Sequence, residues 1–164
     1  MKKFVILFIF IYLNAFSICS VFKNGESIPK KYTCDGKNIS LPVKFINIPE
    51  HTKSIALIMQ DPDAPFGIFT HWIILNVKNN LKENFPKKFK IKDIYQGMND
   101  FGYVGYGGPC PPFYQKHRYI ITAYALDTKI QISNPVNAKK FFYLIKSHII
   151  AKSSLLGFYQ RSKN

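Results

Sequence analysis

The chain has 164 residues, of which 47% are hydrophobic, and this length and composition favour one domain with a substantial core. Its 23 basic and 9 acidic residues give a formal net charge of +14 at pH 7. The lysines are scattered and no run of five basic residues occurs, so the pattern does not indicate a nucleic-acid-binding patch. We therefore expect a single domain and no nucleic-acid partner.

Residues 1–20 are typical of a secretory signal peptide. Two lysines precede an apolar block from Phe4 to Leu13, and small residues follow at a spacing suited to cleavage. The apolar block is shorter than the roughly 20 residues that span a bilayer. An uncleaved membrane anchor is the alternative, because the residues after this block are also mostly apolar. The sequence thus predicts an exported protein, periplasmic or secreted, whose single domain covers residues 21–164.

Three apolar segments in the first half of the chain are predicted to be strands. Leu41–Ile48 alternates apolar and polar residues in its second half, whereas Ser54–Met59 and Trp72–Val77 are short, continuous apolar runs. The polar segment Asp61–Pro65 lies between the last two and is followed by His71. Binding residues often lie on loops that a rigid scaffold holds, so we expect these polar residues at a pocket.

Two loops follow these strands. Lys78–Lys92 is rich in lysine and asparagine without clear periodicity, and we expect it on the surface. Tyr103–Pro109 is rich in glycine, which permits positive φ and close approach of the backbone, and its proline fixes the neighbouring turn. Such a loop can point backbone N–H groups at an anion, although many segments of this composition are only rigid turns.

The next apolar segment, His117–Leu126, is predicted to be a strand with two different faces. The period of two puts His117 and Tyr119 on the same face, so that an imidazole and a phenol stand side by side. Arg118 falls on the opposite face, where we expect a structural ion pair rather than a ligand contact.

The C-terminal segment changes to a helical period. Asn137 can cap a helix from Ala138 to about Lys152, because apolar residues recur there at three- and four-residue steps. Gly157 can end this helix or follow a second short turn. His148 lies on the predicted helix, and we interpret it as a structural residue.

Two cysteines, Cys34 and Cys110, lie in the predicted domain. In an oxidising compartment they can form a disulfide. They can equally be two small buried side chains that never touch. Sequence alone leaves both interpretations open, because it does not give the distance between the two Cα atoms.

Several motifs, in this order along the chain, resemble those of a known family. They are Asp61–Pro65, His71-Trp72, Asn99–Gly102, Gly105–Pro112 and His117–Tyr119. They are similar to the phosphatidylethanolamine-binding protein (PEBP) family, and within it to the bacterial Raf-kinase-inhibitor-like branch of YbhB/YbcL type. The resemblance covers nearly all of the predicted domain.

The resemblance implies a mainly β fold, a Greek-key antiparallel β-sandwich with peripheral and C-terminal helices. It also implies a small anion pocket for phosphate-bearing ligands or phospholipid head groups, without a cofactor. The residues that the resemblance assigns to this pocket are Asp61, Asp63, His71, Gly108, Pro109, His117 and Tyr119.

The chemistry of these residue types agrees with an anion pocket. A glycine lets a phosphate oxygen approach the backbone, and Tyr119, His71 and His117 can each offer one hydrogen-bond donor. A carboxylate would repel a phosphate directly. Asp61 is therefore expected to orient a histidine, to accept a proton from a monoprotonated phosphate, or to meet the ammonium group of ethanolamine.

Two other classes of function are weighed against this one. His71, His117, Asp61 and Asp63 could form a metal site or an acid/base pair. However, the chain has no closely spaced histidine or cysteine pair and no Gly-x-Ser-x-Gly segment. A protein-interaction module that inhibits a kinase or a protease is suggested only by the naming of the family. We expect an exported, non-enzymatic binding module, with peripheral contact to a membrane as a further possibility.

Overall fold

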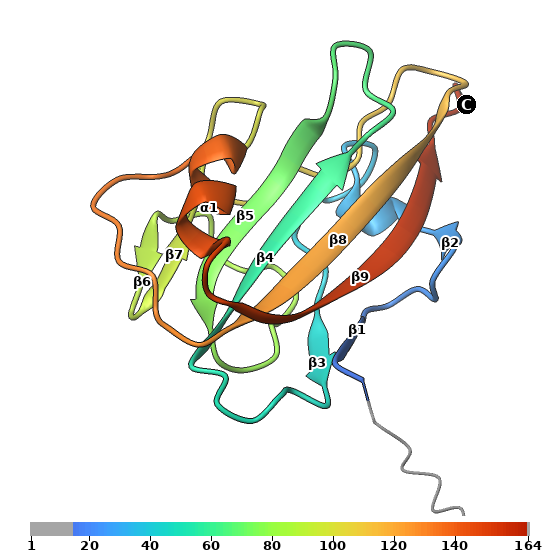
Figure 1. The fold of residues 1–164 in the computed structure, drawn as a ribbon. Helices are drawn as coiled ribbons and strands as arrows, with labels where there is room; N and C mark the ends of the chain where they lie inside the picture. The colour runs from blue at the N-terminus through green and yellow to red at the C-terminus, as the bar shows by residue number, and fades with distance from the viewer. Residues whose placement is uncertain (1–14, 164) are drawn as a thin grey trace, which may run out of the picture.

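The computed structural model describes residues 15–163, and these residues form a mainly β fold (Figure 1). In chain order the elements are β1 (Ser17–Cys19), β2 (Glu26–Ser27), the 3₁₀ helix η1 (Lys30–Tyr32), β3 (Lys44–Ile46), β4 (Ser54–Asp61), β5 (Phe69–Val77), β6 (Lys90–Ile91), β7 (Ile94–Gln96), β8 (Lys116–Leu126), the helix α1 (Ala138–Ile145) and β9 (Ile149–Gln160). In this part of the chain no helix is long and apolar enough to span a membrane.

The main sheet has seven strands in the order β2-β9-β8-β4-β5-β7-β6. All neighbours pair antiparallel except β2 and β9, which are parallel. Within it, β8-β4-β5-β7 is the Greek-key order, because the chain returns from β7 to place β8 beside β4. The predicted mainly β fold is confirmed. The second sheet is small, since β1 pairs only with β3.

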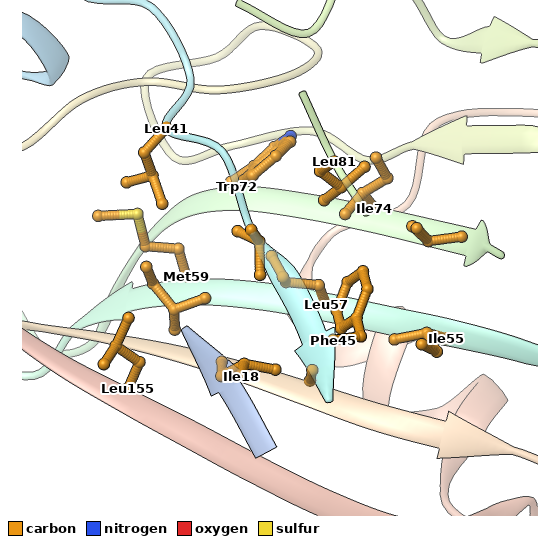
Figure 2. Close-up of a cluster of buried hydrophobic side chains, with 14 of the residues drawn as sticks. Ile18, Leu41, Phe45, Ile55, Leu57, Met59, Trp72, Ile74, Leu81 and Leu155 are labelled. Atoms are coloured by element: carbon orange, nitrogen blue, oxygen red, sulfur yellow. The ribbon is translucent and has the colours of Figure 1, made fainter. Parts of the chain in front are cut away.

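Apolar side chains cover both faces of the main sheet. Ile55, Leu57 and Met59 of β4 point to the face covered by β1 and β3, and Figure 2 shows these side chains packed between the two sheets. Ala56 and Ile58 point to the opposite face, which α1 covers (Figure 1). A strand buried on both faces reads as a continuous apolar run. This explains why the segment shows no alternation in the sequence.

The strand β8 has the two faces that its sequence predicts. His117, Tyr119 and Ile121 are buried, whereas Arg118 is exposed and Ile120 only partly buried. The strands β4, β5 and β8 all extend one to three residues beyond the predicted apolar runs. The extra residues include Asp61, at the end of β4. The strands therefore present polar side chains at one end of the sheet.

The predicted C-terminal helix is too long. Asn137 caps α1 by accepting a hydrogen bond from the Lys140 N–H, but the helix ends at Ile145. From Ile149 the chain forms the long strand β9, which pairs with β8 along its whole length. The apolar residues after Ile145 fitted a helical period by coincidence, and pairing with β8 decides their structure. Gly157 lies within β9 instead of ending a helix.

The predicted surface loop at 78–92 also has more structure than its composition indicates. Leu81 is buried and forms a β-bridge with Val43, and β6 occupies residues 90–91. One buried leucine in a lysine-rich segment gives no periodic signal, so the sequence could not reveal it.

The strand β1 lies just before the predicted start of the domain at residue 21. It pairs with β3 through Ile18 and Phe45, and both Phe16 and Ile18 are buried in the core. Residues 1–14, which include the predicted signal's lysines and apolar block, lie outside the described residues. A chain cut at residue 20 would therefore lose one strand of the small sheet.

We predict that a domain beginning at Val21 is less stable than one beginning at Ala15. Burial of Phe16 and Ile18 should account for about 3 kcal/mol of the free energy of unfolding. Urea denaturation of the two proteins, side by side, measures this difference. Equal midpoints and slopes would show that β1 adds nothing to the fold.

Candidate functional site

A cavity of about 490 Å³ opens at one end of the main sheet. Antiparallel pairing brings the end of β4, the starts of β5 and β8 and the end of β9 to this edge (Figure 1). The polar residues that line the cavity are Asp61, His71, Asp100, His117 and Arg161. The apolar residues include Pro65, Phe66, Ile68, Phe69, Phe101, Pro111 and Pro112. The cavity thus has a few polar groups within a largely apolar wall.

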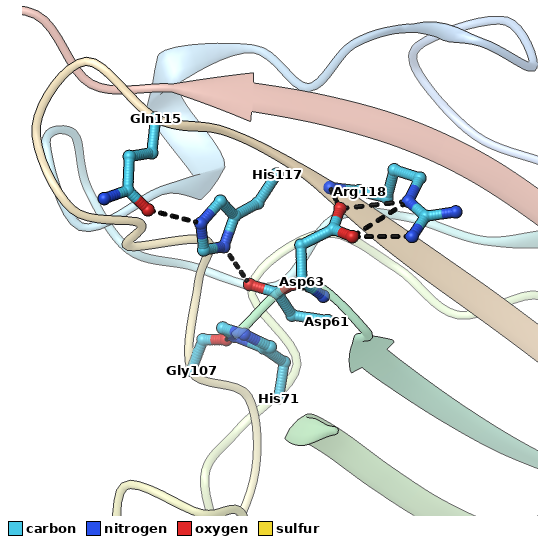
Figure 3. A network of polar contacts seen from close by, with 7 residues as sticks. All are labelled: Asp61, Asp63, His71, Gly107, Gln115, His117 and Arg118. Carbon is cyan, nitrogen blue, oxygen red and sulfur yellow. Dashed lines mark hydrogen bonds and ion pairs between the residues drawn. The ribbon is translucent and has the colours of Figure 1, made fainter. Parts of the chain in front are cut away.

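Asp61 and His117 form a buried pair in this cavity (Figure 3). The His117 Nδ1–H donates to Asp61 Oδ2 over 2.8 Å, and each side chain is only 5% exposed. The second Asp61 oxygen accepts the backbone N–H of Asp63 at 2.8 Å. The carboxylate fixes a proton on Nδ1, so the other ring nitrogen of His117, Nε2, faces the cavity, 3.3 Å from the end of the Gln115 amide. An unprotonated Nε2 is an acceptor, so the Gln115 amide meets it with its NH2 group. Of the three expected roles for Asp61, orienting a histidine fits these contacts.

His71 is held by the backbone of the glycine-rich loop. Its Nδ1–H donates to the Gly107 carbonyl over 2.7 Å, and its ring packs edge-on against Phe101 and Tyr119. Burial lowers the pKa of His71, so the neutral imidazole is favoured. The remaining nitrogen, Nε2, is then an acceptor. The expectation that His71 donates to an anion needs correction, because its one N–H bond is already made to Gly107.

Tyr119 lies behind His71 rather than in the wall of the cavity. Its ring centroid is 5.2 Å from that of His71, and the side chain is fully buried. Within residues 15–163 its hydroxyl has no hydrogen-bond partner. Burial raises the pKa of Tyr119, and the neighbouring Asp61 carboxylate raises it further, which keeps the hydroxyl protonated. Tyr119 therefore packs against the His71 ring, and its contact with a ligand stays a prediction.

Asp63 points away from the cavity and pairs with Arg118 (Figure 3). Its carboxylate accepts hydrogen bonds from the Arg118 guanidinium at 2.6 Å and from the Arg118 backbone N–H at 2.8 Å. The guanidinium hydrogen bonds lower the pKa of Asp63 to about 2. The predicted ion pair of Arg118 is present, and it engages the Asp63 carboxylate, whose ligand-binding role stays a prediction. The pair joins the loop after β4 to β8.

Gly108 and Pro109 lie just before the cavity-lining residues Cys110, Pro111 and Pro112, and their backbone contacts other chain segments. The Gly108 N–H donates to Asn38 Oδ1 over 2.8 Å, and a Cβ at this position would clash with the Tyr32 carbonyl oxygen. The Pro109 carbonyl accepts the Cys34 N–H at 3.1 Å. The glycine is required here by close packing between two chain segments. The ligand contacts expected of Gly108 and Pro109 stay predictions.

Two polar residues of the cavity were missed by the sequence analysis. Arg161 follows β9, a strand that the sequence analysis did not predict, and its guanidinium pairs with Asp35 at 3.0 Å. It also lies over the Phe113 ring at 4.1 Å. Asp100 accepts the Thr70 N–H at 2.7 Å and belongs to a motif that was quoted for the resemblance without a role. A strand assignment for residues 149–160 would have placed Arg161 at this end of the sheet.

Cys110 lines the cavity and lies beside Cys34. Their Cα atoms are 5.4 Å apart and the structure joins the two sulfur atoms as a disulfide. The bond would tie the Pro109–Pro112 wall to the segment after η1. Cys19 is the free cysteine of the described residues.

We predict that the disulfide forms in the exported protein and stabilises it. Replacing Cys34 and Cys110 by serine should lower the free energy of unfolding by about 4 kcal/mol, because the bond closes a long loop, with 76 residues of sequence separation. Cys19→Ser is the matched control and should have little effect. Thiol titration of the denatured, non-reduced protein beginning at Ala15, which keeps Cys19, should find Cys19 alone reactive. Three reactive thiols would contradict the prediction.

A metal site at these residues is not supported by their arrangement. Across residues 15–163, no group of three or more histidine, cysteine, aspartate or glutamate side chains is placed to hold a metal ion. Asp63 faces Arg118, and His71 and Asp61 have their own hydrogen-bond partners. The acid/base alternative would have to use the Asp61–His117 pair.

Comparison with known proteins agrees with the fold and the motifs. A family model described as phosphatidylethanolamine-binding protein matches residues 19–160. A UPF0098 protein from Aquifex aeolicus is 47% identical over 145 residues, which cover 85% of each chain. A crystal structure of a PEBP homologue from Chlamydia trachomatis has 39% identity and a TM-score of 0.83, covering 91% of this chain and 99% of that one. The crystal structure of E. coli YbcL, described as a new member of the mammalian PEBP family, has 30% identity and a TM-score of 0.82, covering 90% of this chain and 99% of that one.

The mainly β sandwich and its end-of-sheet cavity thus place the chain in a class of binding-protein folds. The chain belongs to the phosphatidylethanolamine-binding protein family, among relatives that include bacterial members of known structure. The resemblance drawn from its motifs is confirmed.

Proposed function

We propose that the chain is an exported, non-enzymatic protein that binds a phosphate-bearing small ligand or a phospholipid head group in the cavity of Asp61, His71 and His117. The observation that carries the proposal is the buried Asp61–His117 hydrogen bond. It fixes one imidazole so that Nε2 is available to a ligand, close to the neutral His71 ring. Such fixed polar groups in an apolar cavity are typical of small-ligand sites.

The groups in the cavity suit a monoprotonated phosphate ester better than a fully deprotonated phosphate. Arg161 lines the wall with its guanidinium paired to Asp35, and the donors that Asp35 leaves free can meet a phosphate. A phosphate monoester has its second pKa near about 6, so its monoprotonated form can donate a proton to a neutral imidazole nitrogen. His71 Nε2 is such an acceptor because Gly107 holds the proton on Nδ1. A monoprotonated phosphate carries one such proton, which would bond to His71 Nε2, while Arg161 meets the phosphate oxygens and His117 lies beside the ligand.

The rest of the cavity favours an organic ligand. Asp100 adds an acceptor that can meet an ammonium group, whereas both oxygens of Asp61 are already engaged. Phe69, Phe101 and Pro111 form apolar walls suited to carbon chains rather than to free phosphate. The family name, which refers to phosphatidylethanolamine, also favours a head group of this kind.

Export is supported by two features of the chain. The first residues have the charged, apolar and small-residue order of a signal peptide. Cys34 and Cys110 are placed to form a disulfide, which persists in oxidising compartments.

Calorimetric titration with phosphoethanolamine, ethanolamine and inorganic phosphate tests the proposal. The wild-type protein should bind phosphoethanolamine saturably and prefer it to either fragment. His117→Gln and His71→Gln should each weaken this binding about tenfold or more, which corresponds to 1.4 kcal/mol. His148→Gln is the control, because that exposed histidine pairs with Asp127 away from the cavity.

Thermal unfolding of each variant separates lost binding from lost folding. Failure of the folded wild-type protein to bind phosphoethanolamine, or equal binding by both cavity variants, would reject the proposed function.

A further inference from the structure

The turn between β4 and β5 presents two apolar side chains to solvent. Phe66 is fully exposed, with 103% of its reference area accessible, and Ile68 is 64% exposed. Gly67 lies between them with φ +105°, a backbone conformation that favours glycine. Both side chains line the mouth of the cavity, with half-exposed Phe101. We call Phe66, Gly67 and Ile68 the apolar tip.

A second exposed aromatic site lies at the same end of the molecule. The turn before β8 exposes Phe113 and Tyr114, and in Figure 1 this turn, the β4–β5 turn and the C-terminus all lie at the same end of the sheet. Arg161 joins the two sites, because it lines the cavity and lies over the Phe113 ring. The exposed apolar side chains here are therefore arranged around the cavity.

Basic side chains flank these aromatic residues. Lys163 lies over the Phe113 ring at 5.6 Å, and Lys116 follows Tyr114 two residues later in the chain. The chain as a whole has a net charge of +14. Apolar and aromatic groups that insert at a bilayer interface, flanked by cations that attract anionic lipids, are the two components of peripheral membrane binding.

We propose that this end of the molecule docks on an anionic phospholipid bilayer, with Phe66 and Ile68 inserted among the head groups. Docking in this orientation brings the mouth of the cavity to the lipid surface. A lipid head group could then enter the cavity directly from the bilayer. This role for the docking rests on the proposed function. The docking itself depends on the apolar tip and the flanking cations.

A site-specific probe of insertion tests the proposal in the full chain. Phe66→Trp places an indole at the tip, and Tyr143→Trp places one on exposed α1 as a matched control. The native Trp72 is fully buried and gives a constant background. The vesicles contain phosphatidylethanolamine and phosphatidylglycerol with brominated acyl chains. Quenching of the tip indole reports insertion even if the N-terminal segment also holds the protein on the membrane.

We expect the indole at position 66 to shift to shorter wavelength and to be quenched, while that at 143 is not. Neutral phosphatidylcholine vesicles should give much weaker quenching, because they do not attract the cations. Adding Ile68→Ser and Lys163→Glu to the Phe66→Trp protein should reduce vesicle affinity about tenfold. Adding Ile149→Ser and Ile150→Ser, a comparable apolar loss on β9, should not.

Absence of quenching at position 66, or equal quenching at positions 66 and 143, would overturn the proposal. An apolar tip that binds a protein instead of a membrane would give the first of these results. His117→Gln in the Phe66→Trp background distinguishes the two proposals. Retained quenching with lost phosphoethanolamine binding separates docking from the cavity, whereas lost quenching in a folded protein would contradict docking through the tip.

Discussion

The hydrogen bond between Asp61 and His117 is the contact on which the candidate site depends. It joins the end of β4 to the start of β8, the two central strands of the sheet, and both side chains are buried. Breaking a buried polar pair costs free energy, because removing either side chain leaves the other buried without a hydrogen-bond partner. Asp63 continues the link, since its backbone N–H bonds Asp61 and its carboxylate bonds Arg118. The position of the His117 ring therefore follows from the pairing of two strands.

The other wall of the cavity is held in place by backbone contacts. His71 is bound to the Gly107 carbonyl, and the Gly107 N–H donates back to the His71 carbonyl at 2.9 Å. Gly108 packs against Tyr32, and Cys110 lies beside Cys34. The glycine-rich loop is thus fixed on both sides, by β5 and by the segment after η1. This leaves a preformed cavity, whose polar atoms need little rearrangement to meet a ligand.

The sequence predicted the parts of the fold that follow from local periodicity. The apolar runs gave β4 and β5, and the period of two gave the faces of β8, including the buried His117 and the ion-paired Arg118. The helix after Asn137 was predicted too long, because its apolar residues match both a helix and a strand until the partner strand is known. Arg161 was missed for the same reason. Non-local packing also explains why a glycine stands at position 108, because its neighbours Tyr32 and Asn38 lie some 70 residues earlier in the chain.

Long-range ¹H–¹⁵N NMR of the histidine side chains, with and without phosphoethanolamine, tests the central claim most directly. The account predicts the Nδ1–H tautomer for both His71 and His117 in the free protein, because Gly107 and Asp61 accept those protons. At saturation the Nε2 resonances of these two residues should shift, while those of His51 and His148 stay unchanged. An Nε2–H tautomer for His117, or a saturated complex with unshifted His71 and His117 Nε2 resonances, would contradict the account.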